Sequence, residues 1–149
     1  MGHFQYRWLV QENLALHVVA AIIVQGSRVL ACRRASHKAA PGKWEFPGGK
    51  VDLGEGSHDA LVREIKEELG LDCQAIRTYD ISDTPVGNQT IRLETVICKI
   101  PLIPYLASTD HDGFIWLLPG EISSLDWAEP DLPAVQRLSL LGAFESLLE

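Results

Sequence analysis

The uninterrupted apolar run Val18–Val24 constrains the fold more than any other feature of this sequence. It is rich in β-branched residues and follows His17, so it predicts a buried β-strand over 17–24. Seven residues are far too few to cross a bilayer, which takes roughly 20. The turn-forming residues Gln25–Ser27 come next, and Arg28–Arg34 resumes as the second arm of a hairpin.

Turn residues and apolar spacing divide the middle of the chain. Ala35–Lys43 is a polar loop, and Trp44–Phe46 is a short strand candidate. A helix is expected from Ser57, as its N-cap, to Gly70, which ends it. At about 100° per residue, one arc of this helix carries the apolar residues Leu61, Val62, Ile65 and Leu69.

The second half of the chain predicts two further strands and a closing helix. Alternation over Ile91–Cys98 indicates a half-buried strand, and Phe114–Leu118 is another candidate. Asp131 and Pro133 are typical of a helix start. The apolar face expected for that helix consists of Val135, Leu138, Leu141, Phe144 and Leu148. This order predicts an α/β fold, a mixed sheet covered by helices, and the length predicts one domain over 1–149.

Composition narrows the class of partner. The net charge of −7 and pI near 5.2 disfavour a nucleic-acid polymer or an anionic membrane, but allow a small anion neutralised by metal. The N-terminal residues lack the apolar core of a signal peptide. The three cysteines are odd in number and widely spaced, which indicates reduced thiols. We therefore expect a cytoplasmic protein.

Three glutamates share one face of the predicted helix. Glu64, Glu67 and Glu68 occupy an arc of about 100° beside the apolar stripe. Like charges at this spacing repel, and Arg63 and Lys66 fall elsewhere on the helical wheel. A divalent metal such as Mg²⁺ would relieve the repulsion. Solvated surface glutamates are the alternative, although the preceding pair Gly48-Gly49 would let a loop backbone approach a ligand closely.

Gly49–Leu71 matches a known motif at every specified position. Its sequence, GKVDLGEGSHDALVREIKEELGL, fits the Nudix box G-x5-E-x7-R-E-U-x-E-E-x-G-U. The chain therefore resembles the Nudix hydrolases, which implies an α/β/α sandwich that cleaves a nucleoside diphosphate linked to another group. Further matches resemble the MutT-like branch, which includes 8-oxo-dGTP diphosphatases and CTP pyrophosphohydrolases. These matches are Arg33–Ala35, Trp44–Lys50, Trp116 and Trp127–Pro133.

The resemblance implies roles for the residues of the box. Glu67 and Glu68 would bind Mg²⁺ (or Mn²⁺ in its place) together with the Gly48 carbonyl. Glu64 would lie at the same metal site as general base or organiser of the attacking water. Glu55 and Arg63 would brace the loop and orient the carboxylates by ion pairing. This assignment agrees with the chemistry, since phosphoanhydride hydrolysis needs mainly positioned water and charge neutralisation.

A distal metal-binding glutamate of the MutT-like branch is replaced here. Asp110 stands at that position, one methylene shorter, and Asp112 is the alternative candidate. His111 lies between them. It is read as a structural or exposed loop residue rather than a functional one.

Four residues are candidates for substrate binding. By family position, Arg34, Phe46 and Asp131 would surround the base, and Lys50 would contact phosphate. An ionised Asp131 only accepts hydrogen bonds, so it favours base edges that show donors, such as the cytosine amino group or guanine N1–H and its amine. Each has a structural alternative: an ion pair for Arg34, core packing for Phe46, solvation for Lys50 and helix capping for Asp131.

The leading functional hypothesis is a Mg²⁺-dependent nucleoside triphosphate pyrophosphohydrolase. It would release a nucleoside monophosphate and pyrophosphate and sanitise the nucleotide pool, with modified (8-oxo-purine) or cytosine-type nucleotides favoured. The alternatives are hydrolysis of ADP-ribose, a nucleotide sugar or a dinucleoside polyphosphate, or a nucleotide-binding regulator without catalysis. A monomer or homodimer is expected, with the aromatic residues Phe4, Tyr6 and Trp8 forming either a dimer contact or a satellite of the core.

Overall fold

The computed structural model describes residues 15–102 and 105–149, and β1 (Leu16–Gln25) lies at its centre. β1 pairs with β2 (Arg28–Arg34) and β4 (Gly48–Lys50) in antiparallel orientation. It pairs with β6 (Gln89–Lys99) in parallel over eight residue pairs. The predicted central strand is therefore confirmed. The possible dimer contact at Phe4, Tyr6 and Trp8 lies outside the described residues.

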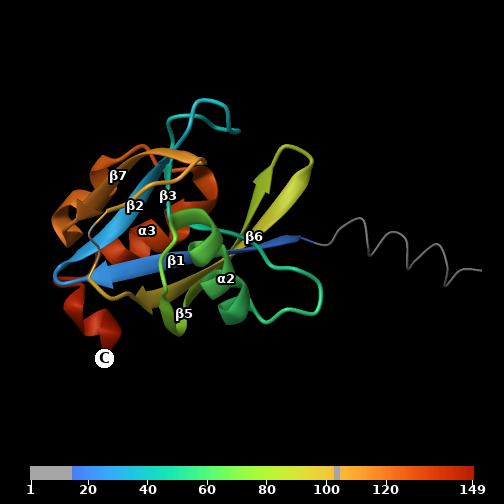
Figure 1. The fold of residues 1–149 in the computed structure, drawn as a ribbon. Helices are drawn as coiled ribbons and strands as arrows, with labels where there is room; N and C mark the ends of the chain where they lie inside the picture. The colour runs from blue at the N-terminus through green and yellow to red at the C-terminus, as the bar shows by residue number, and fades with distance from the viewer. Residues whose placement is uncertain (1–14, 103–104) are drawn as a thin grey trace, which may run out of the picture.

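The remaining strands extend the sheet on both sides. Its order is β3-β2-β1-β6-β5, with β7 also paired to β2. β3 (Trp44–Glu45), β5 (Gln74–Val86) and β7 (His111–Leu117) all join by antiparallel pairing. The sheet is thus mixed, because the β1–β6 pair is parallel and these other pairs are antiparallel (Figure 1).

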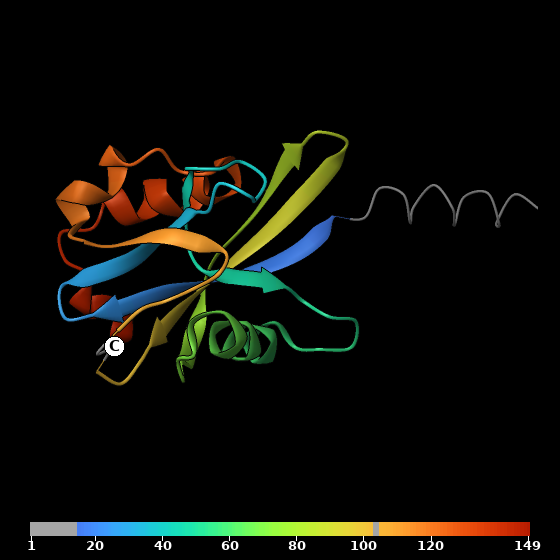
Figure 2. The ribbon, with the colours of Figure 1, turned by 45° about the horizontal axis from the view of Figure 1, so that its top comes forward.

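Helices cover both faces of this sheet. α2 (Ser57–Leu69) lies on one face, and α3 (Leu132–Ser139) lies on the other with the 3-10 helices η1 (Pro119–Ser124), η2 (Glu129–Asp131) and η3 (Glu145–Leu148) (Figure 2). Alternate residues of β1 enter the two cores: Ile22 packs on the α3 side and Ile23 on the α2 side. This is the α/β/α sandwich that the sequence predicted, and it explains why Val18–Val24 is apolar without interruption.

Both predicted helices begin or end differently from the sequence interpretation. Gly56 is the N-cap of α2, and the Ser57 hydroxyl instead donates a hydrogen bond to Glu94 at 2.9 Å. Val62 is 38% exposed rather than in the core. α3 ends at Ser139, and Phe144 reaches the core only after the chain has turned. Local spacing did not show which edge of the apolar arc the sheet would cover.

Two strands were not expected from the sequence: β4 had been interpreted as a loop, and β5 had not been assigned. Gly48–Lys50 pairs with β1 as β4, although its glycines had indicated a loop. β5 is thirteen residues long, but its pairing with β6 shifts register at two places, near Ile76 and Tyr79. Such irregularities break the alternation by which a strand is recognised. In the described residues, no helix has the length and apolarity needed to cross a membrane.

Candidate active site

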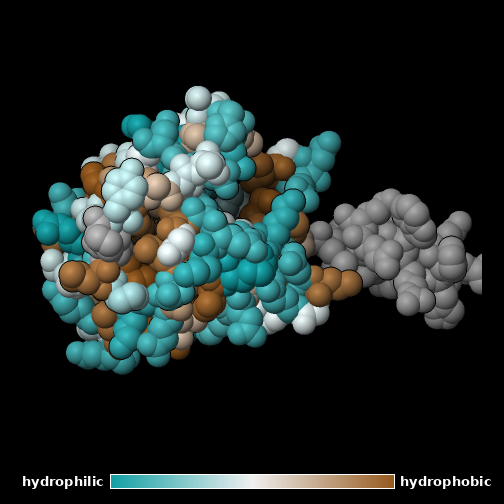
Figure 3. Space-filling view, in the orientation of Figure 1, coloured by the Kyte–Doolittle hydropathy of each residue, from teal (hydrophilic) through white to brown (hydrophobic). Residues whose placement is uncertain are grey.

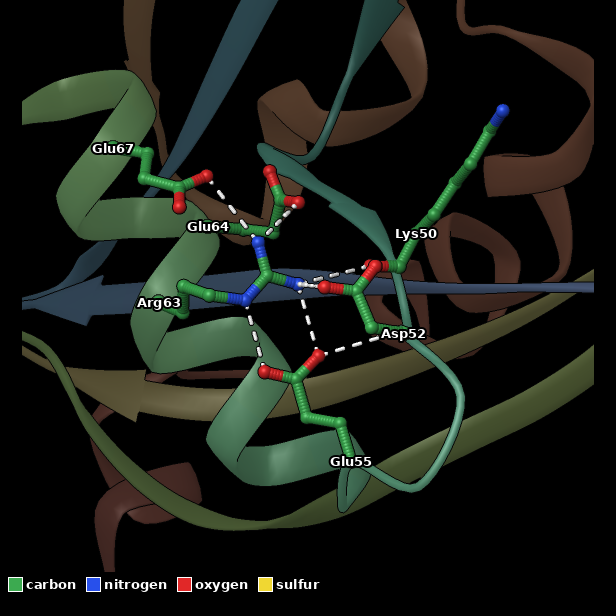
Figure 4. Close-up of polar contacts among 6 residues, drawn as sticks. All are labelled: Lys50, Asp52, Glu55, Arg63, Glu64 and Glu67. Carbon is green, nitrogen blue, oxygen red and sulfur yellow. Dashed lines mark hydrogen bonds and ion pairs between the residues drawn. The ribbon is translucent and has the colours of Figure 1, made fainter.

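Arg63 joins the loop after β4 to the acidic face of α2 (Figure 4). Its Nε and one terminal nitrogen donate to the two carboxylate oxygens of Glu55, both at 2.9 Å. Its other terminal nitrogen donates to Glu64 at 2.9 Å and to Glu67 at 3.2 Å. Arg63 therefore contacts two of the three glutamates that share this face, although it falls elsewhere on the helical wheel. Glu68 is not among its partners.

Ion pairing in this network shifts the pKa values of Glu55 and Arg63 so that both charged forms are favoured. The hydrogen bonds from Arg63 lower the pKa of Glu55 to about 2, and the same contacts with Glu55 and Glu64 raise the pKa of Arg63. Glu55 also bends the loop, since its backbone N–H donates to Asp52 O at 3.0 Å and its carboxylate accepts from Asp52 N at 3.1 Å. Glu55 and Arg63 therefore have the contacts needed for the bracing role proposed from the sequence.

Glu68 faces a different environment from its neighbours on the helix. Its side chain is only 8% exposed, and its Oε1 lies 2.8 Å from Nδ1 of His111. The other nitrogen of that ring, Nε2, lies 2.8 Å from Glu45 Oε2. Burial raises the pKa of Glu68, and the contact with His111 opposes but does not cancel this effect. His111 is thus a buried residue of β7 and not the exposed loop histidine that was one expectation.

His111 is flanked by two carboxylates at the start of β7. Burial by itself would lower its pKa, but hydrogen bonding to Glu45 and Glu68 outweighs burial and raises the pKa to about 9. Sequence reasoning missed Glu45. A signal was present, since Glu45 lies between two aromatic residues, Trp44 and Phe46, in a predicted strand and must point to the opposite side from both.

The backbone of β4 turns some of its carbonyl groups toward α2. Pro47 O accepts a hydrogen bond from Ala21 N at 2.7 Å, so this carbonyl faces β1. Carbonyl direction alternates along a strand, and the Lys50 carbonyl indeed accepts from Arg63 at 3.3 Å on the other edge. The Gly48 carbonyl, two residues before Lys50, points to that same edge and is available as a ligand.

The oxygen donors at this edge fit a hard divalent cation. The three glutamates of α2 and the Gly48 carbonyl supply only oxygen, the donor type that Mg²⁺ takes. Glu68 Oε1 is buried, and apart from its ion contact with His111 it has no polar partner among the described residues. At Gly49, an added Cβ would lie 2.3 Å from the Glu64 carboxyl carbon. Within 15–102 and 105–149, no three acidic, histidine or cysteine side chains already form a metal cluster. Arg63 contacts Glu64 and Glu67, and His111 contacts Glu68.

The distal aspartates have separate partners. Asp110 Oδ1 lies 3.4 Å from the Lys38 ammonium, while Asp112 Oδ1 accepts from Arg33 Nε at 2.7 Å. Of the two candidates, Asp110 is the one whose charge contributes to the raised pKa of Glu68, after the larger effect of burial.

A pocket of about 840 Å³ adjoins β4. Its wall includes all four residues proposed to bind substrate, which are Arg34, Phe46, Lys50 and Asp131. Apolar side chains gather on the surface beside the β5–β6 hairpin, which also contributes to the wall (Figure 3). The Lys50 side chain points away from the Arg63 network, whereas its carbonyl faces that network (Figure 4). β4 therefore separates the pocket from the acidic face by the width of one strand.

Two residues of the pocket wall also make structural contacts. Phe46 is 3% exposed and packs against Trp127 with ring centroids 4.8 Å apart. Arg34 donates to Glu45 Oε1 at 2.9 Å, the ion pair that was its structural alternative. For both residues, the structural reading and the pocket location are compatible.

Asp131 holds the N-cap position of α3, but its side chain makes no capping hydrogen bond. Its Oδ2 instead accepts from the backbone N–H of Phe46 at 2.9 Å. Burial raises the pKa of Asp131 well above its usual value, and the hydrogen bond from the Phe46 backbone opposes this effect. The side chain thus contacts Phe46 in place of the helix cap that was its structural alternative.

Comparison with known proteins agrees with this geometry. The model of the NUDIX domain matches residues 15–141. The chain belongs to the Nudix family. It is 31% identical over 129 residues to the CTP pyrophosphohydrolase of Escherichia coli K12, with 86% of this chain and 94% of that protein covered. Over a shorter stretch of 64 residues it is 40% identical to the 8-oxo-dGTP diphosphatase of Proteus vulgaris, with 42% and 57% covered.

A solved structure of the MutT protein from methicillin-resistant Staphylococcus aureus has the same fold. It superposes with a TM-score of 0.67 at 33% identity, covering 86% of this chain and 98% of that one. The Nudix protein described here is thus an enzyme, a hydrolase of phosphoric anhydride bonds with MutT-like relatives. The CTP pyrophosphohydrolase and the MutT structure each cover 86% of this chain, so the resemblance seen in the box extends to the strands that build the pocket.

Proposed function

We propose that this Nudix hydrolase is a Mg²⁺-dependent nucleoside triphosphate pyrophosphohydrolase. The observation that carries the proposal is the position of β4. One side of its Gly48–Lys50 backbone lines the pocket, and the Lys50 carbonyl on its other edge contacts Arg63 of the glutamate helix. A nucleotide with its base in the pocket would extend its phosphates across β4 to the carboxylates.

Each charged group then has a defined task. Glu67, Glu68 and the Gly48 carbonyl would hold the metal, with Asp110 as a more distant ligand. A bound Mg²⁺ supplies neutralisation of phosphate charge and orientation of water. Glu64 would accept the proton of the attacking water, and Arg63 would orient Glu64 through its 2.9 Å hydrogen bond. Water adds at phosphorus, the anhydride bond breaks, and a nucleoside monophosphate and pyrophosphate are released.

The base would be selected in the pocket, on the side of β4 away from the glutamate helix. Arg34, Phe46 and Asp131 line that end of the pocket, while Lys50 would contact phosphate. Asp131 would present its carboxyl group to the base edge while its Oδ2 accepts from the Phe46 backbone N–H. The relatives named for CTP and for 8-oxo-dGTP support cytosine-type or oxidised purine nucleotides as the favoured substrates.

A one-pot competition tests this proposal. CTP, 5-methyl-CTP, dGTP, 8-oxo-dGTP and ADP-ribose are mixed with enzyme and Mg²⁺, and products are separated by anion-exchange chromatography. We expect monophosphate and pyrophosphate from one base class, and no turnover when EDTA is present. Exclusive consumption of ADP-ribose would move the enzyme to the sugar-linked class. Nucleotide binding without any turnover would indicate a regulator instead.

A further inference from the structure

A continuous line of ion contacts runs from the glutamate helix to the nucleotide pocket. Glu68 Oε1 contacts His111 Nδ1 at 2.8 Å, and His111 Nε2 contacts Glu45 Oε2 at 2.8 Å. The other oxygen of Glu45 accepts from Arg34 at 2.9 Å. Four residues from α2, β7, β3 and β2 are thereby connected, with His111 as the link between the two carboxylates.

The two ends of this line belong to different parts of the site. Arg34 and Glu45 line the pocket, whereas Glu68 is not among the pocket's lining residues. The His111 side chain is 1% exposed, so its contacts with the two carboxylates, and that of Nδ1 with Ser108 Oγ at 3.3 Å, are shielded from solvent. Burying such groups is expensive, and apolar side chains of similar size generally stabilise a core as well or better. A role in positioning explains why charged groups occupy this place.

We propose, building on the function proposed above, that His111 is a positioning residue that couples metal binding to nucleotide binding. By holding one oxygen of Glu68, the imidazole restricts the orientation of that metal-binding carboxylate, as outer contacts of metal ligands commonly do. A nucleotide that contacts Arg34 or Glu45 restrains the far end of the same line. Because each ligand restrains the same line of contacts, each strengthens the binding of the other. The effect has the same size in both directions, since coupling between two sites is reciprocal.

Two substitutions separate the contacts of His111. In His111→Asn, the amide nitrogen occupies the place of Nδ1 and keeps a donor for Glu68, but it cannot reach Glu45. In His111→Gln, the amide nitrogen reaches the place of Nε2 and keeps a donor for Glu45 while the donor for Glu68 is lost. A third variant, Glu45→Gln, weakens the pocket end and leaves His111 and Glu68 intact. Asp72→Asn, which breaks an exposed ion pair with Lys66, is the control.

The measurement is Mn²⁺ affinity by titration calorimetry, with and without α,β-methylene analogues of CTP and dGTP. In the wild type we expect an analogue to tighten Mn²⁺ binding about 5-fold or more. His111→Gln should weaken Mn²⁺ binding about 10-fold without any nucleotide. His111→Asn and Glu45→Gln should keep that basal affinity but reduce the tightening by the analogue, because only the direct contact between phosphate and metal remains. Asp72→Asn should behave as the wild type.

The outcomes distinguish this inference from the proposed function. If the wild type hydrolyses nucleotides but shows no tightening, or if the His111 variants keep it, the coupling role is wrong and the function stands. If the wild type binds Mn²⁺ but neither analogue, the proposed function fails first. Thermal unfolding checks each variant. Should the His111 variants unfold, Glu45→Gln decides alone, because a purely structural Glu45 would leave the tightening unchanged.

Discussion

At the scale of single residues, Glu67 combines exposure with a charge that the proposed chemistry needs. Its side chain is 61% exposed and contacts Arg63 at 3.2 Å. Glu67→Gln removes the charge of a proposed metal ligand, so we expect Mg²⁺-dependent kcat to fall about 100-fold, since metal stabilisation is worth several kcal/mol. The free energy of unfolding should change by about 0.5 kcal/mol or less.

The control for Glu67→Gln is Lys66→Gln on the same helix, where an exposed Lys66 pairs with Asp72 away from the site. Steady-state kinetics and urea unfolding measure both variants. A Glu67→Gln enzyme with wild-type turnover would remove Glu67 from the metal site.

Alanine substitutions at the adjacent glycines Gly48 and Gly49 should have different effects, on stability at Gly48 and on turnover at Gly49. At Gly49 the added Cβ meets the flexible carboxylate of Glu64 at 2.3 Å, whereas at Gly48 it meets the backbone oxygen of Val19 at 1.9 Å. Gly49→Ala should therefore lower kcat with little loss of stability, because the Glu64 side chain can move. Gly48→Ala should destabilise the fold by about 3 kcal/mol, since the backbone of β1 cannot move away from the added Cβ.

Kinetics and chemical denaturation of the two alanine variants form a matched pair. Equal loss of stability in both would show that Glu64 cannot yield, and that Gly49 has a structural role in the β1–β4 pairing.

At the scale of elements, Glu94 of β6 holds four elements together. Its carboxylate accepts hydrogen bonds from Ser57 of α2 at 2.9 Å and Thr78 of β5 at 2.7 Å, and lies 3.1 Å from His17 of β1. Burial would raise the pKa of Glu94, but these hydrogen bonds prevail and lower it below 4.5. Glu94 thus fixes the start of the helix that carries the box glutamates.

We expect Glu94→Gln to cost about 2 kcal/mol of unfolding free energy at pH 7, the usual worth of charged hydrogen bonds. Because the folded pKa is lowered, this stabilisation is present above the unfolded value near 4.5 and is lost as the pH falls through the folded value. Denaturant unfolding between pH 7 and pH 3 should show the difference between variant and wild type shrinking. A difference that grows toward low pH would contradict the assignment.

At the scale of the whole molecule, the C-terminal segment closes the core face under α3. Phe144 is fully buried there, although it lies beyond the end of α3, whereas Leu140 is 85% exposed. Phe144→Ala should destabilise the protein by about 3–5 kcal/mol through cavity formation. Leu140→Ala should cost about 0.5 kcal/mol or less. Thermal and urea unfolding test the pair, and similar losses for both would mean that the segment does not complete the core.

Several features of this enzyme were decided by the sequence alone. The central strand followed from Val18–Val24, the α2 helix from its apolar spacing and Gly70, and the family from Gly49–Leu71. Each depends on residues close together in the chain, where backbone geometry makes the spacing of side chains predictable. The sequence also named the four residues that line one pocket, through the resemblance to the MutT-like branch.

Other features depended on tertiary structure. His111 comes from 66 residues beyond Glu45, and no local pattern shows that the two meet. Burial raises the pKa of Asp131, and its carboxylate accepts from the backbone of Phe46, 85 residues away in the sequence. Desolvation and long-range contact set the charge and orientation of a side chain, and both arise only when distant segments pack together.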